Sequence, residues 1–281
     1  MKSTGILIIG VIYNTYPETL RYLESLRSIQ GEDFTLILVD NSERPAPSSF
    51  LDKIRKVPFT EYMKSERNMG YFHGAWEGLK HYLRVNTAYP EWILVTNVDI
   101  VFTAGFFSKL REYKDHQIPE VIAPAIISQR WNADYNPKLQ KRYTKRELQF
   151  YLFLYSSFIL HNLFLLLAYL KKWIRGRSHP GVNGAPGGSV RQKKIYAPHG
   201  SCIVFNKSYF LSGGTLELPN FLFGEEILVA ETAAQLGLDV LYDPEMVIFD
   251  HEHASTGFFI SPKVNKYNRE AVKAILERYY T

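Results

Sequence analysis

The chain is almost without cysteine, since Cys202 is the only one among its 281 residues. A single cysteine excludes an internal disulfide and a cysteine-rich zinc site, and it is typical of proteins in a reducing compartment. The N-terminus has a short apolar run with one lysine and lacks a small-residue cleavage site. We therefore interpret this run as the first strand of the fold.

Two phosphate-binding motifs are also missing. Neither a G-x-G-x-x-G fingerprint nor a Walker A lysine signature occurs in the sequence, so nothing indicates a Rossmann dinucleotide site or a P-loop. The apolar content of 46%, with 15% aromatic residues, is sufficient for a large buried core. We expect one large domain, or one domain that carries an insertion.

Acidic residues are scarce between residues 131 and 194. This segment has twelve Lys or Arg residues against Asp134 and Glu147, although the net charge of the whole chain is only +5. A basic segment in an otherwise acidic chain predicts an anionic partner, such as nucleic acid or a membrane surface. The basic residues flank an apolar run and do not alternate with exposed aromatics, so we expect no nucleic-acid partner.

Charged residues are absent from Leu148 to Leu170, a run long enough to cross a membrane. Both flanks of the run are basic, and a single crossing would separate the two halves of the fold. We therefore expect an interfacial helix or a shallow helical hairpin on an anionic membrane surface, at the cytoplasmic face of the cell membrane. The alternative is a helical subdomain that packs against the core or against the partner in a homodimer.

Strand and helix patterns alternate from Gly5 to Ser128, which predicts an α/β fold with a parallel sheet and helices on both faces. Strand patterns resume at residues 194–205, and the chain ends in a helical pattern near residues 264–280. Three glycines, Gly70, Gly74 and Gly78, recur at four-residue spacing in one predicted helix. They permit close approach either to a neighbouring strand or to a ligand.

Acids follow two of the predicted strands. Asp40 ends the strand 34–40, and Asp99 follows the strand 92–95 after Asn97. Ligands bind at the carboxyl ends of strands in open α/β sheets, so Asp99 is a candidate for holding a metal or a phosphate-bound cation. The alternative is that Asp99 caps the helix that begins near Ala104.

Two further groups of ligand-type residues occur near the C-terminus. Glu225 and Glu226 stand at the start of a predicted helix, where isolated acids would simply favour the N-terminus. His251 and His253 form an H-x-H pattern, which on a strand places both imidazoles on one face and suits a metal, although such pairs are often structural.

The order of these features resembles the family 2 glycosyltransferases of the GT-A fold, and most closely a bacterial rhamnosyltransferase-like branch that builds surface polysaccharides. The resemblance extends from Gly5 to about Thr256. Its blocks, in order, are VIYNTYPETLRYLESL, LVDNSE, RNMGYFHGAWEG, TNVDIVF, PHGSCIVFNKSYFLSGG, FLFGEEI and GLDVLYDPEMVIFDHEHAST. It implies a mostly parallel central sheet with helices on both faces, plus a helical membrane-associating insertion.

The resemblance also implies three regions and a donor site. Residues 1–130 would form the nucleotide-sugar-binding half, residues 131–194 the insertion, and residues 195–281 the acceptor and catalytic half with the C-terminal helix. Asp40 resembles the residue that hydrogen-bonds the nucleobase of the donor, with Arg67 and Asn68 in the same pocket. The donor site would also include Gly70 and Asn97, and Asn97 replaces the first acid of the family's D-x-D element.

The remaining roles concern the metal and the chemistry. Asp99 resembles the last acid of the D-x-D element, whose Mg²⁺ or Mn²⁺ stabilises the charge that develops on the leaving diphosphate. His251 or His253 resembles the distal histidine that completes this site. Glu225 and Glu226 resemble the family's Glu-Asp pair, with Glu226 at the position of the general base. That base would deprotonate the acceptor hydroxyl as the hydroxyl attacks the anomeric carbon from the face opposite the diphosphate, which gives inversion.

The resemblance therefore implies an inverting glycosyltransferase in surface glycan synthesis. It would move a sugar, with rhamnose as the common case of the branch, from a dTDP- or UDP-sugar donor to a lipid-linked or glycan acceptor. The alternative is a non-catalytic, membrane-associated nucleotide-sugar-binding or scaffold protein of the same fold.

Overall fold

A computed structural model describes residues 5–29, 33–113, 118–174, 191–251 and 260–280. The strands are β1 (Ile6–Ile12), β2 (Phe34–Asp40), β3 (Thr60–Lys64), β4 (Trp92–Asn97), β5 (Ile100–Phe102), β6 (Val121–Ser128), β7 (Ala133–Asp134), β8 (Lys193–Lys194), β9 (Cys202–Asn206) and β10 (Val240–Asp250). The helices are α1 (Tyr16–Arg27), α2 (Ser48–Ile54), α3 (Tyr71–Val85), α4 (Ala104–Glu112), α5 (Lys145–Leu154), α6 (Phe158–Ile174), α7 (Lys207–Leu211), α8 (Glu225–Leu236) and α9 (Pro262–Tyr279).

The strands form a single ten-stranded sheet in the order β3-β2-β1-β4-β9-β6-β10-β5, with β7 beside β6 and β8 beside β10. Strands β3, β2, β1 and β4 are parallel neighbours. Strand β9 is antiparallel to both β4 and β6, so β6 runs in the direction of β4, and β10 is parallel to β6. Six strands therefore share one direction, which confirms the mostly parallel α/β fold expected from the sequence.

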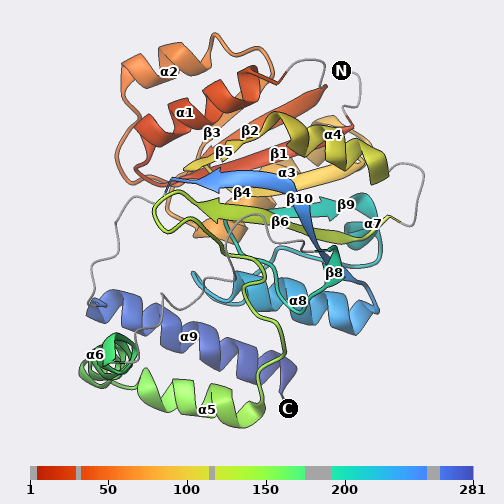
Figure 1. Cartoon of the computed structure of the whole chain (residues 1–281). Helices are drawn as coiled ribbons and strands as arrows, with labels where there is room; N and C mark the ends of the chain where they lie inside the picture. The colour runs from red at the N-terminus through yellow and green to blue at the C-terminus, as the bar shows by residue number, and fades with distance from the viewer. Residues whose placement is uncertain (1–4, 30–32, 114–117, 175–190, 252–259, 281) are drawn as a thin grey trace.

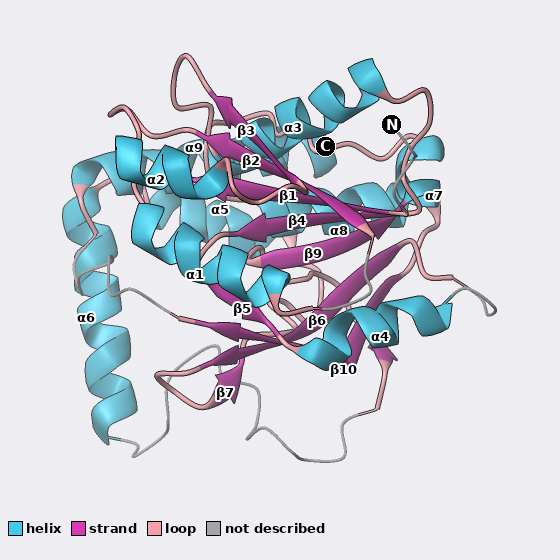
Figure 2. Ribbon diagram, turned by 90° about the horizontal axis from the view of Figure 1, so that it is seen from above, coloured by secondary structure: helices cyan, strands magenta, loops and turns pink. Residues whose placement is uncertain are grey.

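The core has one layer on each face of the sheet (Figures 1 and 2). Strand β1 is buried along its whole length, because its alternate side chains serve both layers. Ile8 packs in the cluster that includes residues of α1 and α4, whereas Ile9 packs in the cluster that includes residues of α3, α7 and α8. This two-sided burial explains why the strand reads as a continuous apolar run with no alternation.

The glycines of α3 serve close packing inside the protein. A Cβ atom at Gly78 would lie 2.8 Å from Ile9 and 3.1 Å from Val39, and one at Gly74 would lie 2.7 Å from Asn41. The sequence left open whether these glycines allow close approach to a strand or to a ligand. At Gly74 and Gly78 the approach is to strands β1 and β2 and to the residue that follows β2.

The region expected as an insertion begins and ends within the main sheet, because β7 pairs with β6 and β8 pairs with β10. Between these strands, α5 and α6 lie against α9 in a layer below α8 (Figure 1). Leu148 of α5 is buried with Ile275 and Tyr280, and Asn162 of α6 exchanges two hydrogen bonds with the backbone of Ile260, at 2.9 and 2.7 Å. Residues 175–190 lie outside the described part.

The apolar run 148–170 forms two helices with a break after α5. Among the described residues, none of the helices alone is long and apolar enough to cross a membrane. Helix α5 and residues 158–171 meet that criterion only as a pair, and the pair is bent by 112°.

Candidate active site

Asp99 lies in the short turn between β4 and β5, at the carboxyl end of the parallel strands. The N-cap residue of α4 is Thr103, so the alternative interpretation of Asp99 as a helix cap is wrong. The backbone N–H of His251 donates a hydrogen bond to the carbonyl oxygen of Asp99, at 3.1 Å. This contact brings the end of β10 beside the turn. His253, the other predicted ligand, lies outside the described residues.

Asp250, the last residue of β10, supplies a carboxylate that the sequence did not single out. It is buried, and one of its oxygens accepts a hydrogen bond from the Ser201 hydroxyl at 3.2 Å. Burial and the negative charge of Asp99 raise the pKa of Asp250 to about 7, against the opposing effect of the Ser201 hydrogen bond. Two carboxylates therefore interact electrostatically where the resemblance predicted a carboxylate and histidines.

The loop between β8 and β9 connects this acid pair to the rest of the site. Asn97 donates its backbone N–H to the Ser201 carbonyl at 2.9 Å, and its side-chain amide lies 3.5 Å from the Ser201 hydroxyl. The preceding residue, Gly200, accepts a hydrogen bond from Tyr71 at 2.7 Å. On its other side, a Cβ atom built on Gly200 would lie 3.4 Å from Glu226. Residues 200 and 201 therefore stand between the acid pair and the start of α8.

The adjacent acids Glu225 and Glu226 occupy different environments. Glu225 is buried and accepts a hydrogen bond from the backbone N–H of Phe223 at 3.1 Å. Burial and then the charge of Glu226 raise the pKa of Glu225 to about 7. The Glu226 side chain is 19% exposed, and its carboxylate lies 3.9 Å from the Lys138 ammonium. Glu226 is thus the accessible acid of the pair, whereas Glu225 is fixed against its own loop.

Tyr71, at the start of α3, lies between the two acidic groups. Burial is the main cause that raises the pKa of Tyr71 well above the usual range, and the neighbouring acids Glu225 and Asp99 raise it further. Its hydroxyl therefore remains protonated as the donor to Gly200. In the sequence, Tyr71 is distinguished only by its position at the first turn of a glycine-rich helix.

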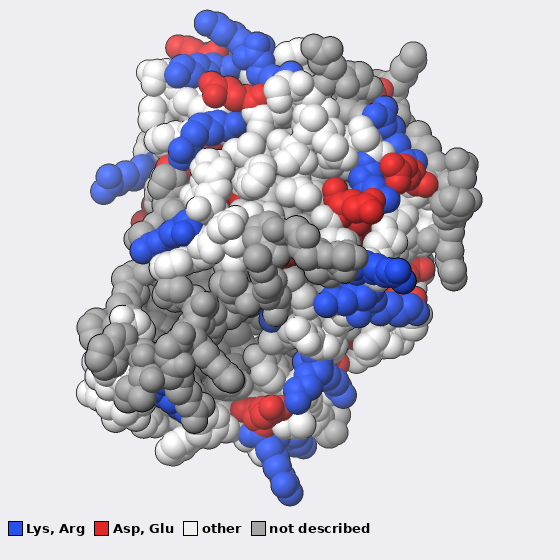
Figure 3. Space-filling view, in the orientation of Figure 1, with Lys and Arg blue, Asp and Glu red and all other residues white. Residues whose placement is uncertain are grey.

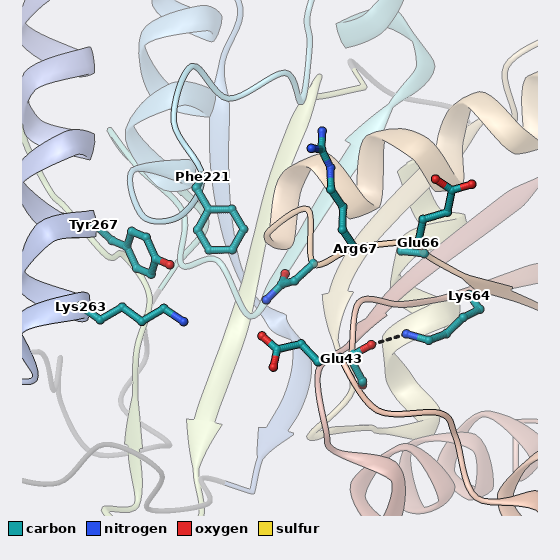
Figure 4. Close-up of a pocket in the computed structure, with 10 residues that line it drawn as sticks. Glu43, Lys64, Glu66, Arg67, Phe221, Lys263 and Tyr267 are labelled. Carbon is teal, nitrogen blue, oxygen red and sulfur yellow. Dashed lines mark hydrogen bonds between the residues drawn. The ribbon is translucent and has the colours of Figure 1, made fainter.

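A cavity of about 520 Å³ lies beside the carboxyl ends of β2 and β3. Figure 4 shows its two walls, with Phe221, Tyr267 and Lys263 on one side and residues around β3 on the other. Its lining consists of Ser42, Glu43, Lys64, Ser65, Glu66, Arg67, Asn68, Phe221, Lys263 and Tyr267. Arg67 and Asn68 were expected in the donor pocket, whereas the wall from the C-terminal helix α9 was not anticipated.

Asp40 is fully buried and is not among the residues that line this cavity. Its carboxylate accepts hydrogen bonds from the Tyr62 hydroxyl at 2.5 Å, the Tyr16 hydroxyl at 3.2 Å and the backbone N–H of Ser42 at 2.8 Å. Ser42 itself lines the cavity. In the structure, Asp40 therefore holds the edge of the cavity through Ser42.

Gly70 joins the two walls of the cavity. It has a φ angle of +84°, and a Cβ atom there would lie 2.0 Å from the carbonyl oxygen of Phe221. Its backbone N–H donates to the Asn68 side chain at 2.9 Å, and its carbonyl accepts from Asn41 at 2.7 Å. Only glycine satisfies both the backbone angle and this approach, which seats the loop of Phe221 against the Arg67–Asn68 turn.

The two carboxylates of the acid pair fit a divalent cation whose remaining ligands come from the substrate. Within the described ranges, there is no cluster of three or more His, Cys, Asp or Glu side chains arranged for a metal. Mg²⁺ sites in phosphate-transfer enzymes commonly use one or two carboxylates together with substrate phosphates and water. Asp99 and Asp250 provide two such carboxylates, and a cation between them would relieve the repulsion that raises the pKa of Asp250.

Known structures share this arrangement of the sheet. The crystal structure of GalNAc-T7 with UDP, GalNAc and Mn²⁺ is similar at a TM-score of 0.60 and 14% identity, and the match covers 98% of this chain and 49% of that one. S. aureus TarS 1–349 in complex with UDP-GlcNAc is similar at a TM-score of 0.60 and 12% identity, with 96% and 66% covered. The chain thus spans about half the length of GalNAc-T7. At such identities the likeness establishes the GT-A fold.

The fold and the acids at the carboxyl ends of its strands define a domain of the GT-A glycosyltransferase class. The family model of glycosyl transferase family 2 matches residues 7–174, which is more than half of the chain. The chain therefore belongs to glycosyl transferase family 2, and the family predicted from the sequence is confirmed. Among curated proteins, no sequence matches it.

Proposed function

We propose that this protein transfers a sugar from a nucleoside diphosphate donor to an acceptor hydroxyl, with inversion at the anomeric carbon. The observation that carries the proposal is the arrangement around residues 200 and 201. Ser201 bonds Asp250 of the acid pair, whereas Gly200 faces the accessible carboxylate of Glu226. A site for a leaving diphosphate and a general base are thus connected by two consecutive residues.

The donor nucleotide occupies the cavity of about 520 Å³. Arg67 and Lys263 contribute positive charge, and the rings of Phe221 and Tyr267, with centroids 5.0 Å apart, offer an aromatic surface for the base. The chemistry of the neighbours' ligands, UDP and UDP-GlcNAc, supports a pyrimidine nucleotide and hence a UDP- or dTDP-sugar. Asp40 acts here through the position of Ser42.

Asp99 and Asp250 hold the divalent cation, Mg²⁺ or Mn²⁺, against the donor diphosphate. When bound, the cation stabilises the negative charge that the nucleoside diphosphate gains as it leaves. The Mn²⁺ in the GalNAc-T7 crystal structure supports a divalent ion in this fold. Asn97 and Ser201 position Asp250 and contribute no charge.

Glu226 accepts the proton of the acceptor hydroxyl as its oxygen attacks the anomeric carbon. The new glycosidic bond forms on the face opposite the diphosphate, so the configuration inverts. The Lys138 ammonium lies 3.9 Å from this carboxylate. Glu225 is buried and bonds the backbone N–H of Phe223, and it thereby stabilises the turn that positions Glu226.

The acceptor carries a lipid, and the protein binds the cytoplasmic face of an anionic membrane through α5 and α6. The support is an exposed apolar surface on these helices, in a molecule whose other large apolar side chains are mostly buried. Its members are Phe150 (49% exposed), Phe153 (64%), Phe158 (42%), Ile159 (66%), Leu163 (49%), Phe164 (37%), Leu167 (55%), Tyr169 (50%) and Leu170 (43%). Basic residues such as Lys145 and Arg146, both exposed at the start of α5, would face lipid headgroups.

A donor screen tests the proposed function. The purified protein is incubated with UDP- and dTDP-sugars, including dTDP-rhamnose, and release of the nucleoside diphosphate is measured with Mg²⁺, with Mn²⁺ and with a chelator. We expect release from at least one donor and its loss with the chelator. Tight binding of UDP or dTDP without any release would favour the alternative, a non-catalytic protein that retains the fold.

A further inference from the structure

A second cavity, of about 350 Å³, is lined by Glu226 and shares no lining residue with the donor cavity. Helix α5 forms one wall, α9 forms another, and the start of α8 closes the inner end (Figure 1). Glu225, Glu226 and Lys138 are its charged lining residues. Its volume is in the range of small-ligand sites, about 300–1,000 Å³.

Three tyrosines line the wall that α5 and the residues on either side of it provide. The ring centroids of Tyr143 and Tyr151 are 5.6 Å apart, and those of Tyr151 and Tyr155 are 5.9 Å apart with an interplanar angle of 23°. Burial raises the pKa of Tyr143 and of Tyr155 to about 12, so both hydroxyls stay neutral. The wall therefore offers flat apolar faces together with hydroxyl groups.

The opposite wall is mainly apolar. Ala271, Val272 and Ile275 of α9 face the cavity together with Ile227 of α8, and Asn268 adds one amide group. A ligand that fits these surfaces has apolar faces and a ring of hydrogen-bonding groups at its edge. A pyranose ring has that composition, because its C–H faces stack on aromatic rings while its hydroxyls reach Tyr, Asn and Glu side chains.

The tyrosine wall is fixed relative to the catalytic helix. The Arg142 guanidinium makes two hydrogen bonds to Glu231 of α8, at 2.6 and 2.8 Å, and Glu231 is 2% exposed. Thr144 then caps α5 in a reciprocal arrangement with Glu147. These contacts attach the residues around Tyr143 to α8, so the tyrosine wall is held in a fixed position relative to Glu226.

We propose that this cavity is the acceptor subsite and that it binds the terminal saccharide of the acceptor, with Tyr143, Tyr151 and Tyr155 as the stacking surface. The proposal rests on the proposed transfer reaction, since Glu226 at the inner end would take the proton of the bound sugar's hydroxyl. It assigns to α5 a role in substrate binding besides the contact with lipid. The more apolar alternative occupant, a lipid tail, is an outcome of the test.

The test measures saccharide binding directly, without catalysis. Methyl glycosides of rhamnose, glucose, galactose and N-acetylglucosamine are screened against the full chain by saturation-transfer NMR. We expect at least one glycoside to bind, and its affinity to fall on the order of tenfold in Tyr151→Ala. Tyr151→Phe should keep most of the affinity, because it keeps the ring. Phe153→Ala, which removes an exposed aromatic of the same helix outside the cavity, is the matched control.

A second variant keeps the test valid if Tyr151→Ala fails to fold. Asn268→Ala lies on α9, removes only the amide group of the cavity, and should also weaken binding. Absence of binding by every glycoside, or equal binding by wild type, Tyr151→Ala and Asn268→Ala, would overturn the acceptor subsite. Displacement of a bound glycoside by the single-chain lipid decylphosphocholine, with no dependence on Tyr151, would point to a lipid tail instead and also overturn it. If saccharides bind but the donor screen shows no turnover, the result would contradict the proposed transfer reaction and leave the saccharide site intact.

Discussion

Glu225 and Glu226 are neighbours in sequence but differ in what surrounds them. The buried carboxylate of Glu225 has a pKa raised from 4.5 to about 7, so the folded protein binds its proton more tightly than the unfolded chain does. Its contribution to stability is therefore present below pH 4.5 and is lost as the pH rises to about 7. The loss is about 3 kcal/mol, from 1.36 kcal/mol for each pKa unit.

This difference predicts the behaviour of Glu225→Gln. The variant should be more stable than wild type at pH 8, by up to about 3 kcal/mol, and should differ little from it at pH 4.5. Urea denaturation at both pH values measures the effect. Glu217→Gln, at an exposed glutamate, is the control and should leave the pH dependence as in wild type. An unchanged pH dependence in Glu225→Gln would show that this carboxyl is not held protonated.

Gly70 is a second position where one residue controls the site. Gly70→Ala places a methyl group 2.0 Å from the Phe221 carbonyl at a φ angle of +84°, so we expect destabilisation of at least about 1–3 kcal/mol. Thermal denaturation tests this, with nucleotide binding as a second readout because Phe221 lines the donor cavity. Gly105→Ala is the matched control, since a Cβ atom there meets nothing within 4 Å and helix propensity favours alanine. Equal stability of the two variants would contradict the close approach.

Among single residues, the sequence identified some members of the site and missed others, and the difference has a physical reason. Asp99 and Glu226 stand out because each follows or begins an element with a recognisable pattern. Asp250 and Ser201 do not, because they meet only through the pairing of β10 and β9 with strands far away in sequence. The criterion that selected Asp40, an acid at the end of a strand, would also have selected Asp250.

Helix α5 is attached to the catalytic half of the fold through Arg142. Its guanidinium bonds the buried Glu231 and the carbonyl of Tyr279 at 3.0 Å, and it lies 4.4 Å from the ring centroid of Tyr280. This contact joins residues before α5 to α8 and to the end of α9. Local patterns predicted the helices themselves, but they carry no information on an ion pair between residues so distant.

Arg142→Ala should destabilise the protein by about 1–3 kcal/mol, because it leaves the carboxylate of Glu231 buried without its cation. Arg142→Lys should recover only part of this, since lysine keeps the charge but not the two parallel hydrogen bonds. Chemical denaturation measures both. Arg146→Ala, at an exposed arginine of α5, is the control. A loss in Arg142→Ala no larger than in this control would show that the ion pair does not fasten α5.

The charge of the whole molecule is more evenly distributed than the sequence suggests. Some described basic residues of the region 131–194 pair with acids of the remaining chain, as Arg142 does with Glu231 and Lys194 with Asp239, the latter at 2.5 Å. On the face shown in Figure 3, Lys and Arg side chains are dispersed and several stand beside Asp or Glu. Part of the charge asymmetry in the sequence therefore reflects contacts within the protein, and the membrane proposal depends mainly on the apolar surface of α5 and α6.

That surface gives a prediction for membrane binding. The protein should sediment with vesicles that contain anionic phospholipid and less with neutral vesicles. The double variant Ile159→Asp and Leu167→Asp should lose most of this binding, because both side chains are more than half exposed on α6. Leu211→Asp changes a 67% exposed leucine on α7 and should bind as wild type does. Wild-type protein that stays in solution with anionic vesicles would rule out the interfacial role.

The central claim is that Glu226 is the base and that Asp99 holds the cation at the diphosphate. The most direct measurement is sugar transfer, or donor turnover, by Glu226→Gln and Asp99→Ala beside wild type and the exposed control Glu217→Gln. We expect a loss of at least about a hundredfold in each site variant, with retained nucleotide binding in Glu226→Gln and an unchanged rate in the control. Wild-type rates in both site variants would contradict it.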